Sequence, residues 1–267
     1  MKNRTMLLLL SISYFVLYAL NLMLPLQGAN RTTRIWDVTE LLLAFGACLV
    51  LIRLGHALKK EWILSGALLG GLSGFSHYCH DPSILGTLLE VAAVALTICA
   101  SLLVLSRPNT RKITILPRSW HHLLRDLLLG VLLALPFALL NNLFFYLQRG
   151  ASIWQPPLMA AFFALSPAIH EEIVFRLFIL SFCLYLLRYS RHPRSVIAIS
   201  LVLAVVPHSL NHLPDLFLKQ PLSALFLFGG TSIVFGLPMA LIQFKWGLMA
   251  AIAFHWFIDA FRFSFGY

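Results

Sequence analysis

Long apolar runs separated by short polar loops are the dominant pattern along this chain. A helix needs roughly 20 apolar residues to cross a bilayer core of about 30 Å, and runs of that length recur throughout. A shorter run, 62–77, is rich in Gly and Ser. The pattern predicts an all-α, polytopic transmembrane helical bundle of eight or nine helices. The long runs are 6–26, 37–58, 84–106, 123–146, 157–188, 195–213, 221–243 and 247–266.

Two segments decide between eight and nine helices. The run 62–77 counts as a transmembrane helix only if it spans the whole bilayer. The run 157–188 is long enough to be broken at Pro167 into two helices. The longest polar interval, 107–122, divides the chain into two expected parts. Residues 1–122 form N-terminal transmembrane helices and a cytoplasmic loop, and residues 123–267 form a core that holds most of the polar groups within apolar runs.

Composition supports a membrane protein and argues against binding to nucleic acid. The chain is 60% hydrophobic and 11% charged, with a mean hydropathy of +0.85. The net charge of +10 comes from Lys and Arg scattered over short loops, not from one basic stripe. Their bias to one side predicts a multi-pass protein of the cell membrane with a cytoplasmic N-terminus. Tryptophans near segment ends, Trp36 among them, are expected to anchor to the interface.

Three charged residues lie in the middle of the apolar run 157–188. They are Glu171, Glu172 and Arg176. A charge at the bilayer centre costs roughly 3 kcal/mol and indicates a functional site. On a helix Glu172 and Arg176 are i,i+4 neighbours that can pair, while Glu171 points about 100° away and can face a cavity. The alternative is a structural ion pair that fixes helix packing.

Histidines and a carboxylate lie in two later runs. His208 and His212 lie at or just beyond the end of one run, and His255 and Asp259 are i,i+4 on the last. Imidazoles and a glutamate on separate helices are the groups needed to activate a water and stabilise an oxyanion. Taken singly, these residues are also compatible with helix capping or a structural hydrogen bond.

The order of these motifs resembles a known family. EExxxR, a histidine one helix later and HxxxN/D in the final helix are similar to the CAAX protease and bacteriocin-processing (CPBP, or Abi) family of intramembrane proteases. The tracts 235–241 and 246–251 resemble the family's Gly-containing penultimate helix and its turn. The similarity covers roughly residues 155–260, and it makes 123–267 a CPBP-like protease core.

The resemblance implies a role for each motif residue. Glu171 would be the general base that activates water, with Glu172 and Arg176 as its supports. His255 and Asp259 would form the oxyanion site that polarises the scissile carbonyl. Asp259 stands where Asn is commoner, and a charged Asp opposes an oxyanion unless it is protonated or holds His255 as an imidazolium.

The second motif departs from the family pattern, which is FxxxH. His208 would sit beside the water, but Ala204 occupies the aromatic position four residues earlier. We favour His208 because it is deeper in the apolar run, and His212 is the fallback.

A zinc site is the alternative to a cofactor-free mechanism. Glu171, His208 and His255, with His212 as the fallback, could make a His₂Glu set with an open water position. No HExxH is present, and the resemblance is compatible with both chemistries. We favour the metal-free one.

The sequence therefore predicts an intramembrane endopeptidase that meets membrane lipid and a peptide or protein substrate, prenylated or secreted. Two other classes stay open. One is a proton-relay transporter that uses Glu171, His208 and His255, although no inverted repeat supports it. The other is a non-catalytic scaffold or bacteriocin-immunity protein, which the altered second motif would suit.

Overall fold

The structure is a computed structural model that describes residues 2–24 and 30–267. Within these ranges every regular element is helical, which confirms the all-α prediction; residues 25–26 of the first expected run lie outside them. The helices are α1 (Lys2–Met23), α2 (Arg31–Leu54), α3 (Lys60–His80), α4 (Ile84–Ser106), α5 (Trp120–Arg149), α6 (Pro157–Phe163), α7 (Leu165–His170), α8 (Phe178–Leu186), α9 (Pro193–Asn211), α10 (Pro214–Lys219), α11 (Pro221–Thr231), α12 (Leu237–Trp246) and α13 (Leu248–Ser264), with the shorter segments η1 (Gly55–Ala57), η2 (Glu171–Leu177) and η3 (Ser232–Gly236).

Six helical segments of the described chain are long and apolar enough to cross a membrane. The Gly-rich run 62–77 also forms a helix, the 21-residue α3, and the last run forms the 17-residue α13. The protein is therefore a multi-pass membrane protein, and the total of eight or nine spans stays a prediction. The six segments are Thr5–Met23, Arg31–Ala57, Ile84–Ser106, Trp120–Arg149, Pro193–Asn211 and Pro221–Trp246.

Local sequence explains where several helices begin. The side chains of Asn30, Ser83 and Ser119 each accept a hydrogen bond from a backbone N–H in the first turn of α2, α4 and α5. Helices α6, α9, α10 and α11 begin with proline, which has no N–H to leave unsatisfied at that position. Each boundary follows from a short polar or proline signal between two apolar runs.

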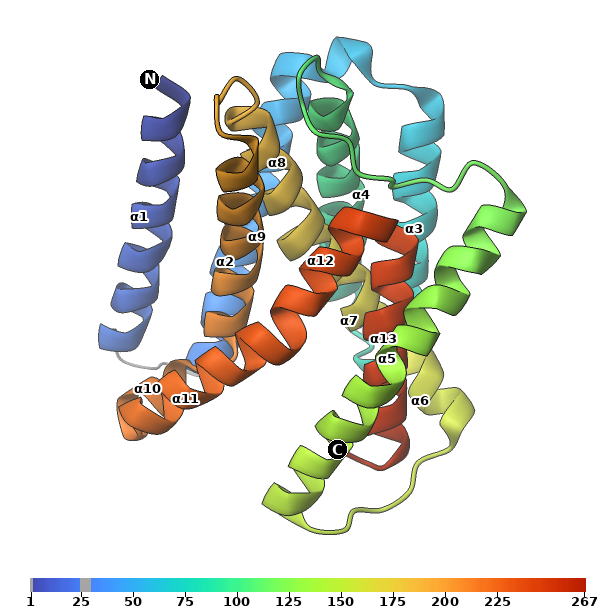
Figure 1. Cartoon of the computed structure of the whole chain (residues 1–267). Coiled ribbons are helices and arrows are strands. Elements are labelled where there is room, and N and C mark those ends of the chain that lie inside the picture. Colours follow the sequence, from blue (N-terminus) through green and yellow to red (C-terminus); the bar gives the residue numbers. More distant parts are fainter. Residues whose placement is uncertain (1, 25–29) are drawn as a thin grey trace.

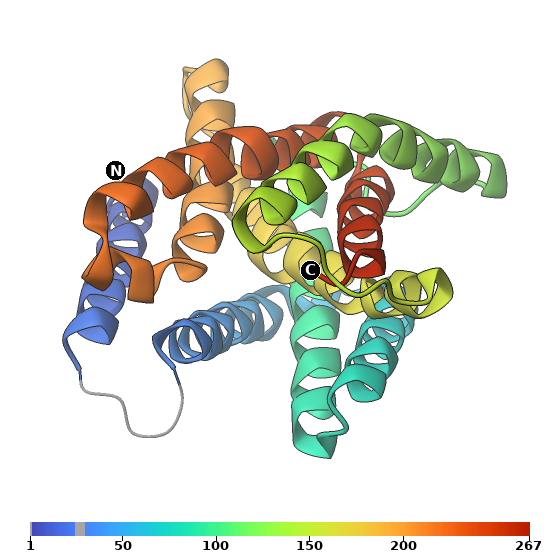
Figure 2. The same cartoon turned by 90° about the horizontal axis from the view of Figure 1, so that it is seen from below.

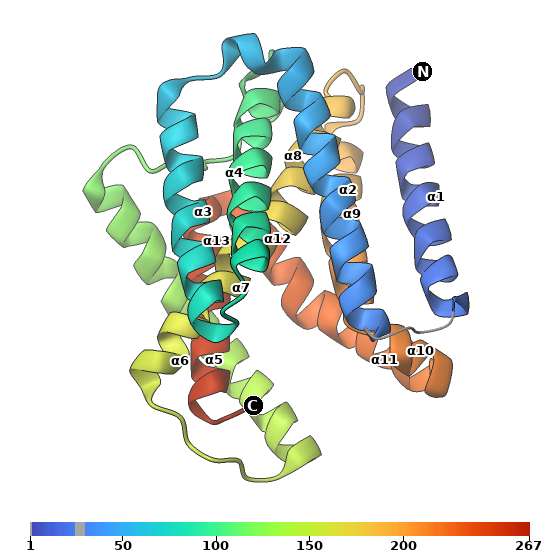
Figure 3. The ribbon, with the colours of Figure 1, turned by 180° about the vertical axis from the view of Figure 1, so that it is seen from behind.

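The helices are arranged around α13 and the segment α7–η2. Helix α13 packs against α5, α6 and α12, and in Figure 1 it lies behind the strongly tilted α5. Helices α3 and α4 pack side by side, with α2 on the other side of α4 (Figure 3). Seen from below, α1 lies at the edge of the bundle (Figure 2). Only 11% of its span is buried, against 61% for α4, so α4 is a core helix and α1 a peripheral one.

A glycine allows the polar interval to pass beneath the turn between α12 and α13. Gly247 has φ +102°, a left-handed value that favours glycine. A Cβ there would lie 2.4 Å from the carbonyl oxygen of Thr114, and the next residue, Leu248, donates its N–H to that same oxygen at 2.9 Å. The loop 107–119 is thereby fixed against the start of α13, which carries His255.

The expected break in the run 157–188 occurs at Ala164 and not at Pro167. The hydroxyl of Ser76 donates to the carbonyl of Phe162 (2.8 Å) and accepts from the N–H of Ser166 (3.1 Å). These two backbone groups would bond each other in an unbroken helix, so the serine is inserted into the ladder and separates α6 from α7. Pro167, the position considered in the sequence, lies within α7, and the sequence does not reveal the break at Ala164 because the Ser76 contact comes from another helix.

Candidate active site

The first motif lies on a π-helical segment. Glu171–Leu177 form η2, which ends with the N–H of Phe178 donating to the carbonyl of Ile173, an i→i+5 bond. Such wide turns are rare in proteins as a whole, but those that occur are often at functional sites. The segment begins where α7 ends, with the N–H of Glu171 donating to the carbonyl of Pro167. This last bond has the ordinary α-helical spacing, so the two glutamates lie where the backbone changes from α-helix to π-helix.

Glu172 and Arg176 form the buried ion pair that their spacing predicts. The Glu172 side chain is fully buried, and its Oε1 accepts from the Arg176 guanidinium. The same oxygen lies 2.9 Å from Nδ1 of His255, and the amide of Gln243 donates to the Glu172 backbone carbonyl at 2.9 Å. Glu172 thus connects η2 to α12 and α13.

Glu171 points to a more open region than Glu172. Its side chain is 17% exposed. Its Oε2 lies 2.5 Å from Nε2 of His208 and 3.7 Å from Nε2 of His255. The carboxylate is therefore flanked by one imidazole from α9 and one from α13.

The tautomer of His208 follows from its two neighbours. A guanidinium can only donate, and Nη2 of Arg176 lies 3.2 Å from Nδ1 of His208. Nδ1 must then accept, so the proton of the neutral ring is on Nε2 and is donated to Glu171. His212, one turn later and exposed, has its ring centroid 5.0 Å from that of His208. Both candidates for the second motif are thus at the site, with His208 in direct contact.

The aromatic neighbours of His208 come from other helices. Trp36 of α2 meets the His208 ring edge-on at 5.3 Å and the His212 ring at 4.9 Å. Phe175 lies 5.9 Å from His208 and 4.6 Å from Trp36. Ala204 is buried where the family pattern has an aromatic residue. The assignment of Trp36 as an interface anchor was incomplete, because position in the sequence does not reveal a contact between α2 and α9.

Asp259 lies between His255 and Arg262. Its Oδ2 lies 3.3 Å from Nε2 of His255, and its Oδ1 lies 2.9 Å from Arg262. Both His255 nitrogens therefore face carboxylates, an arrangement that suits the imidazolium form. Arg176 and Arg262 balance two of the three carboxylates at the site, and a protonated His255 balances the third.

Zinc ligation through His208 fits this arrangement poorly. The ligand atoms of Glu171, His208 and His212 all lie within 4.8 Å of one another. A metal-bound histidine donates its other N–H to an acceptor, and His255, whose Nδ1 faces Glu172, meets that requirement. His208 does not, because its Nδ1 faces the Arg176 guanidinium and its Nε2 carries the proton. The set of Glu171, His208 and His255 therefore does not suit zinc at His208, whereas the fallback set with His212 in place of His208 does not meet this obstacle.

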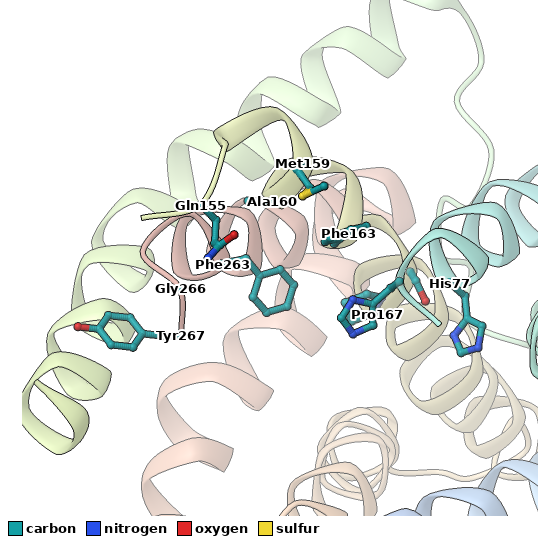
Figure 4. Close-up of a pocket in the computed structure, with 11 residues that line it drawn as sticks. His77, Gln155, Met159, Ala160, Phe163, Pro167, Phe263, Gly266 and Tyr267 are labelled. Atoms are coloured by element: carbon teal, nitrogen blue, oxygen red, sulfur yellow. The ribbon is translucent and has the colours of Figure 1, made fainter. Parts of the chain in front are cut away.

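A pocket of ≈ 460 Å³ (Figure 4) is lined in part by Pro167 of α7, the short helix that directly precedes Glu171. Its walls are mostly apolar, with Met159 and Phe163 from α6 and Phe263 from α13. His77 and His80 line it at the end of α3. Its other lining residues include Ser166 and Tyr267.

Several contacts at or beside the site were missed in the sequence. His170, directly before Glu171, lies between Glu90 and Glu40, two carboxylates from other helices that belong to no motif. Gln243 and Arg262 also contact site residues, but neither belongs to a motif that the sequence reveals. Periodicity shows which residues share one helix face, but it does not show which faces meet.

The comparisons with known proteins agree with the motifs. Residues 152–261 match the family model described as Type II CAAX prenyl endopeptidase Rce1-like. No curated protein and no solved structure gives a significant match to the chain. The matched segment contains all six predicted site residues, and the expected family resemblance is confirmed. Residues 152–261 of this multi-pass membrane protein are therefore similar to the Rce1-like CAAX protease family.

Proposed function

We propose that the protein is an intramembrane endopeptidase that hydrolyses a peptide bond in a membrane-associated peptide, with Glu171 as the base. The observation that supports this is the contact of Glu171 with two histidines from two other helices. Both histidines approach Oε2, and no described residue hydrogen-bonds Oε1, which can therefore accept a proton from a water. Partial exposure of Glu171 gives water a way to reach it.

Hydrolysis would then follow the usual course of general base catalysis. A water oxygen attacks the carbonyl carbon as its proton passes to Glu171. The carbon–nitrogen bond breaks as Glu171 returns the proton to the leaving amine. The N–H of His208 holds the Glu171 carboxylate in position throughout. Every step uses groups that the described residues supply.

His255 is suited to stabilise the oxyanion. Glu172 holds the ring through Nδ1, so Nε2–H is directed toward the space between Glu171 and Asp259. A carbonyl oxygen entering this space would accept from Nε2–H, and a positioned donor of this type contributes about 10²–10³ in rate. Asp259 holds the ring as an imidazolium, while Arg262 offsets the charge of Asp259.

Substrate would enter from the membrane. The pocket in Figure 4 has no Lys, Arg, Asp or Glu among its lining residues, so it suits an uncharged, mainly apolar segment. The exposed apolar residues on the outer helices are suited to lipid. We place the protein in the cell membrane with its N-terminus in the cytoplasm, on the distribution of Lys and Arg.

The test is cleavage of membrane-tethered peptides by the purified protein in liposomes. We expect Glu171→Gln and His255→Ala to abolish cleavage while Glu61→Gln, an exposed carboxylate at the start of α3, does not. Peptide binding without cleavage in every form would favour the scaffold alternative. Proton flux across the liposome that Glu171→Gln removes, without cleavage, would favour the transporter.

A further inference from the structure

A second buried polar cluster lies directly behind Glu171. Its centre is His170, the last residue of α7, whose side chain is 9% exposed. Nδ1 of His170 lies 2.7 Å from Oε2 of Glu90 on α4, and Nε2 lies 3.4 Å from Oε2 of Glu40 on α2. Both ring nitrogens face carboxylates, so the ring is held from both sides by helices that precede the residues matched by the family model.

Glu90 holds more than the histidine. Its Oε1 accepts from the hydroxyl of Ser73 on α3 at 2.5 Å and from the hydroxyl of Ser166 on α7 at 3.0 Å. One carboxylate thus connects α3 and α4 to both ends of the short helix α7. Such convergence fixes both the position and the rotation of α7 about its axis.

The backbone around Glu171 needs lateral support of this kind. The ladder of α6–α7 is opened by Ser76, and Trp256 of α13 donates its indole N–H to the carbonyl of Ala161 at 2.7 Å. Pro167 has no N–H to give to Phe163. At the other end of α7 the wide turns of η2 begin. A six-residue helix between two irregular regions cannot fix Glu171 through its own hydrogen bonds alone.

We propose that Glu90 and Glu40 act through His170 as positioning residues for Glu171. This inference rests on the proposed function. By clamping His170 they hold the start of η2 so that the Glu171 carboxylate meets His208 and a water in the reactive geometry. The helices α2 and α4 of the N-terminal part thereby contribute to catalysis without touching substrate.

The experiment compares three glutamate-to-glutamine variants in liposomes. Glu90→Gln keeps an acceptor for Ser73 and Ser166 but removes the charge opposite His170. Glu40→Gln is the milder change, since Glu40 is 26% exposed and more distant. Glu61→Gln is the matched control. Displacement of a catalytic group by about 1 Å can cost 10²-fold, so we expect kcat to fall about 10–100-fold in Glu90→Gln, less in Glu40→Gln, and KM to stay within twofold.

A second readout does not depend on cleavage. Deuterium uptake by the backbone of residues 165–177 should rise in Glu90→Gln and Glu40→Gln, while uptake by residues 193–211 should match the wild type. Unchanged kcat and unchanged uptake in both variants would overturn the proposal. If Glu90→Gln does not fold, the kcat and the deuterium uptake of Glu40→Gln decide whether the proposal holds. If the wild type cleaves nothing, the proposed function fails, and uptake alone decides whether this clamp positions Glu171.

Discussion

Arg176 contacts His208 at Nδ1, on the side of the ring opposite to Glu171. The guanidinium therefore does two things, because it also neutralises the buried Glu172. It fixes the proton of His208 on Nε2, and this proton holds the Glu171 carboxylate. The arginine of the first motif thus orders the histidine of the second, although the two residues are 32 positions apart.

Removal of Arg176 should destabilise the protein as well as inactivate it. Arg176→Met leaves the Glu172 charge buried without its partner, which costs about 3–5 kcal/mol for a pair of this kind. Thermal unfolding in detergent should show a large fall in apparent Tm. The double variant Glu172→Gln/Arg176→Met should recover much of that fall but not the activity. Equal Tm values for the wild type and Arg176→Met would contradict a stabilising role for the pair.

His208 of α9 and His212, the residue directly after α9, should differ in their effects. His208 contacts Glu171 directly and is buried, whereas His212 is exposed. We expect His208→Asn to lower kcat by about 10²-fold, because Glu171 loses the N–H that holds its carboxylate in the reactive position. His212→Asn should lower it by less than about tenfold. Peptide cleavage rates of the two variants, measured side by side, check this, and the reverse order would assign the second motif to His212.

The sequence predicted the elements of the bundle better than the contacts between them. The run 84–106 matches α4 residue for residue, because its ends carry a serine cap and a polar loop. The two pairs within single helices also form as predicted, since helix spacing places Glu172 near Arg176 and His255 near Asp259. These predictions needed only the period of one helix.

What the sequence did not predict depends on packing between distant helices. Trp36 against His208, and Glu90 against His170, join residues that no local pattern relates. The break at Ala164 has the same origin, because Ser76 comes from α3. A hydroxyl or carboxylate in an apolar run signals a buried contact, but its partner is fixed only by the three-dimensional arrangement.

Activity should survive metal removal. His208 presents a protonated Nε2 to Glu171, so it has no lone pair there for a metal ion. We expect cleavage to stay within about twofold after treatment with EDTA or phenanthroline, and the purified protein to hold far less than one zinc per chain by elemental analysis. Loss of cleavage that added zinc restores would mean that Arg176 moves away from His208 and that Glu171, His208 and His212 bind the ion.

Replacing Asp259 with the commoner asparagine should be tolerated. The asparagine side chain would still offer an oxygen to Nε2–H of His255, and Arg262, which is 25% exposed, can be solvated without its partner. Cleavage by Asp259→Asn should therefore stay within about tenfold of the wild type. Asp259→Leu removes the acceptor and should lose at least 10²-fold, comparable to the loss of an oxyanion donor. Equal losses in both variants would show that the negative charge itself is required.

Filling the pocket beside the site should weaken substrate binding more than catalysis. Met159 lines the pocket, whereas its neighbour Leu158 is 85% exposed on the outer face of α6. Met159→Trp should raise KM for an apolar peptide several-fold with kcat little changed, because uniform binding is lost while the reacting groups are intact. Leu158→Trp adds the same bulk outside the pocket and should match the wild type. If both variants bind and cleave like the wild type, the substrate reaches Glu171 by another path, and the exposed side of Glu171 near His212 becomes the region to map.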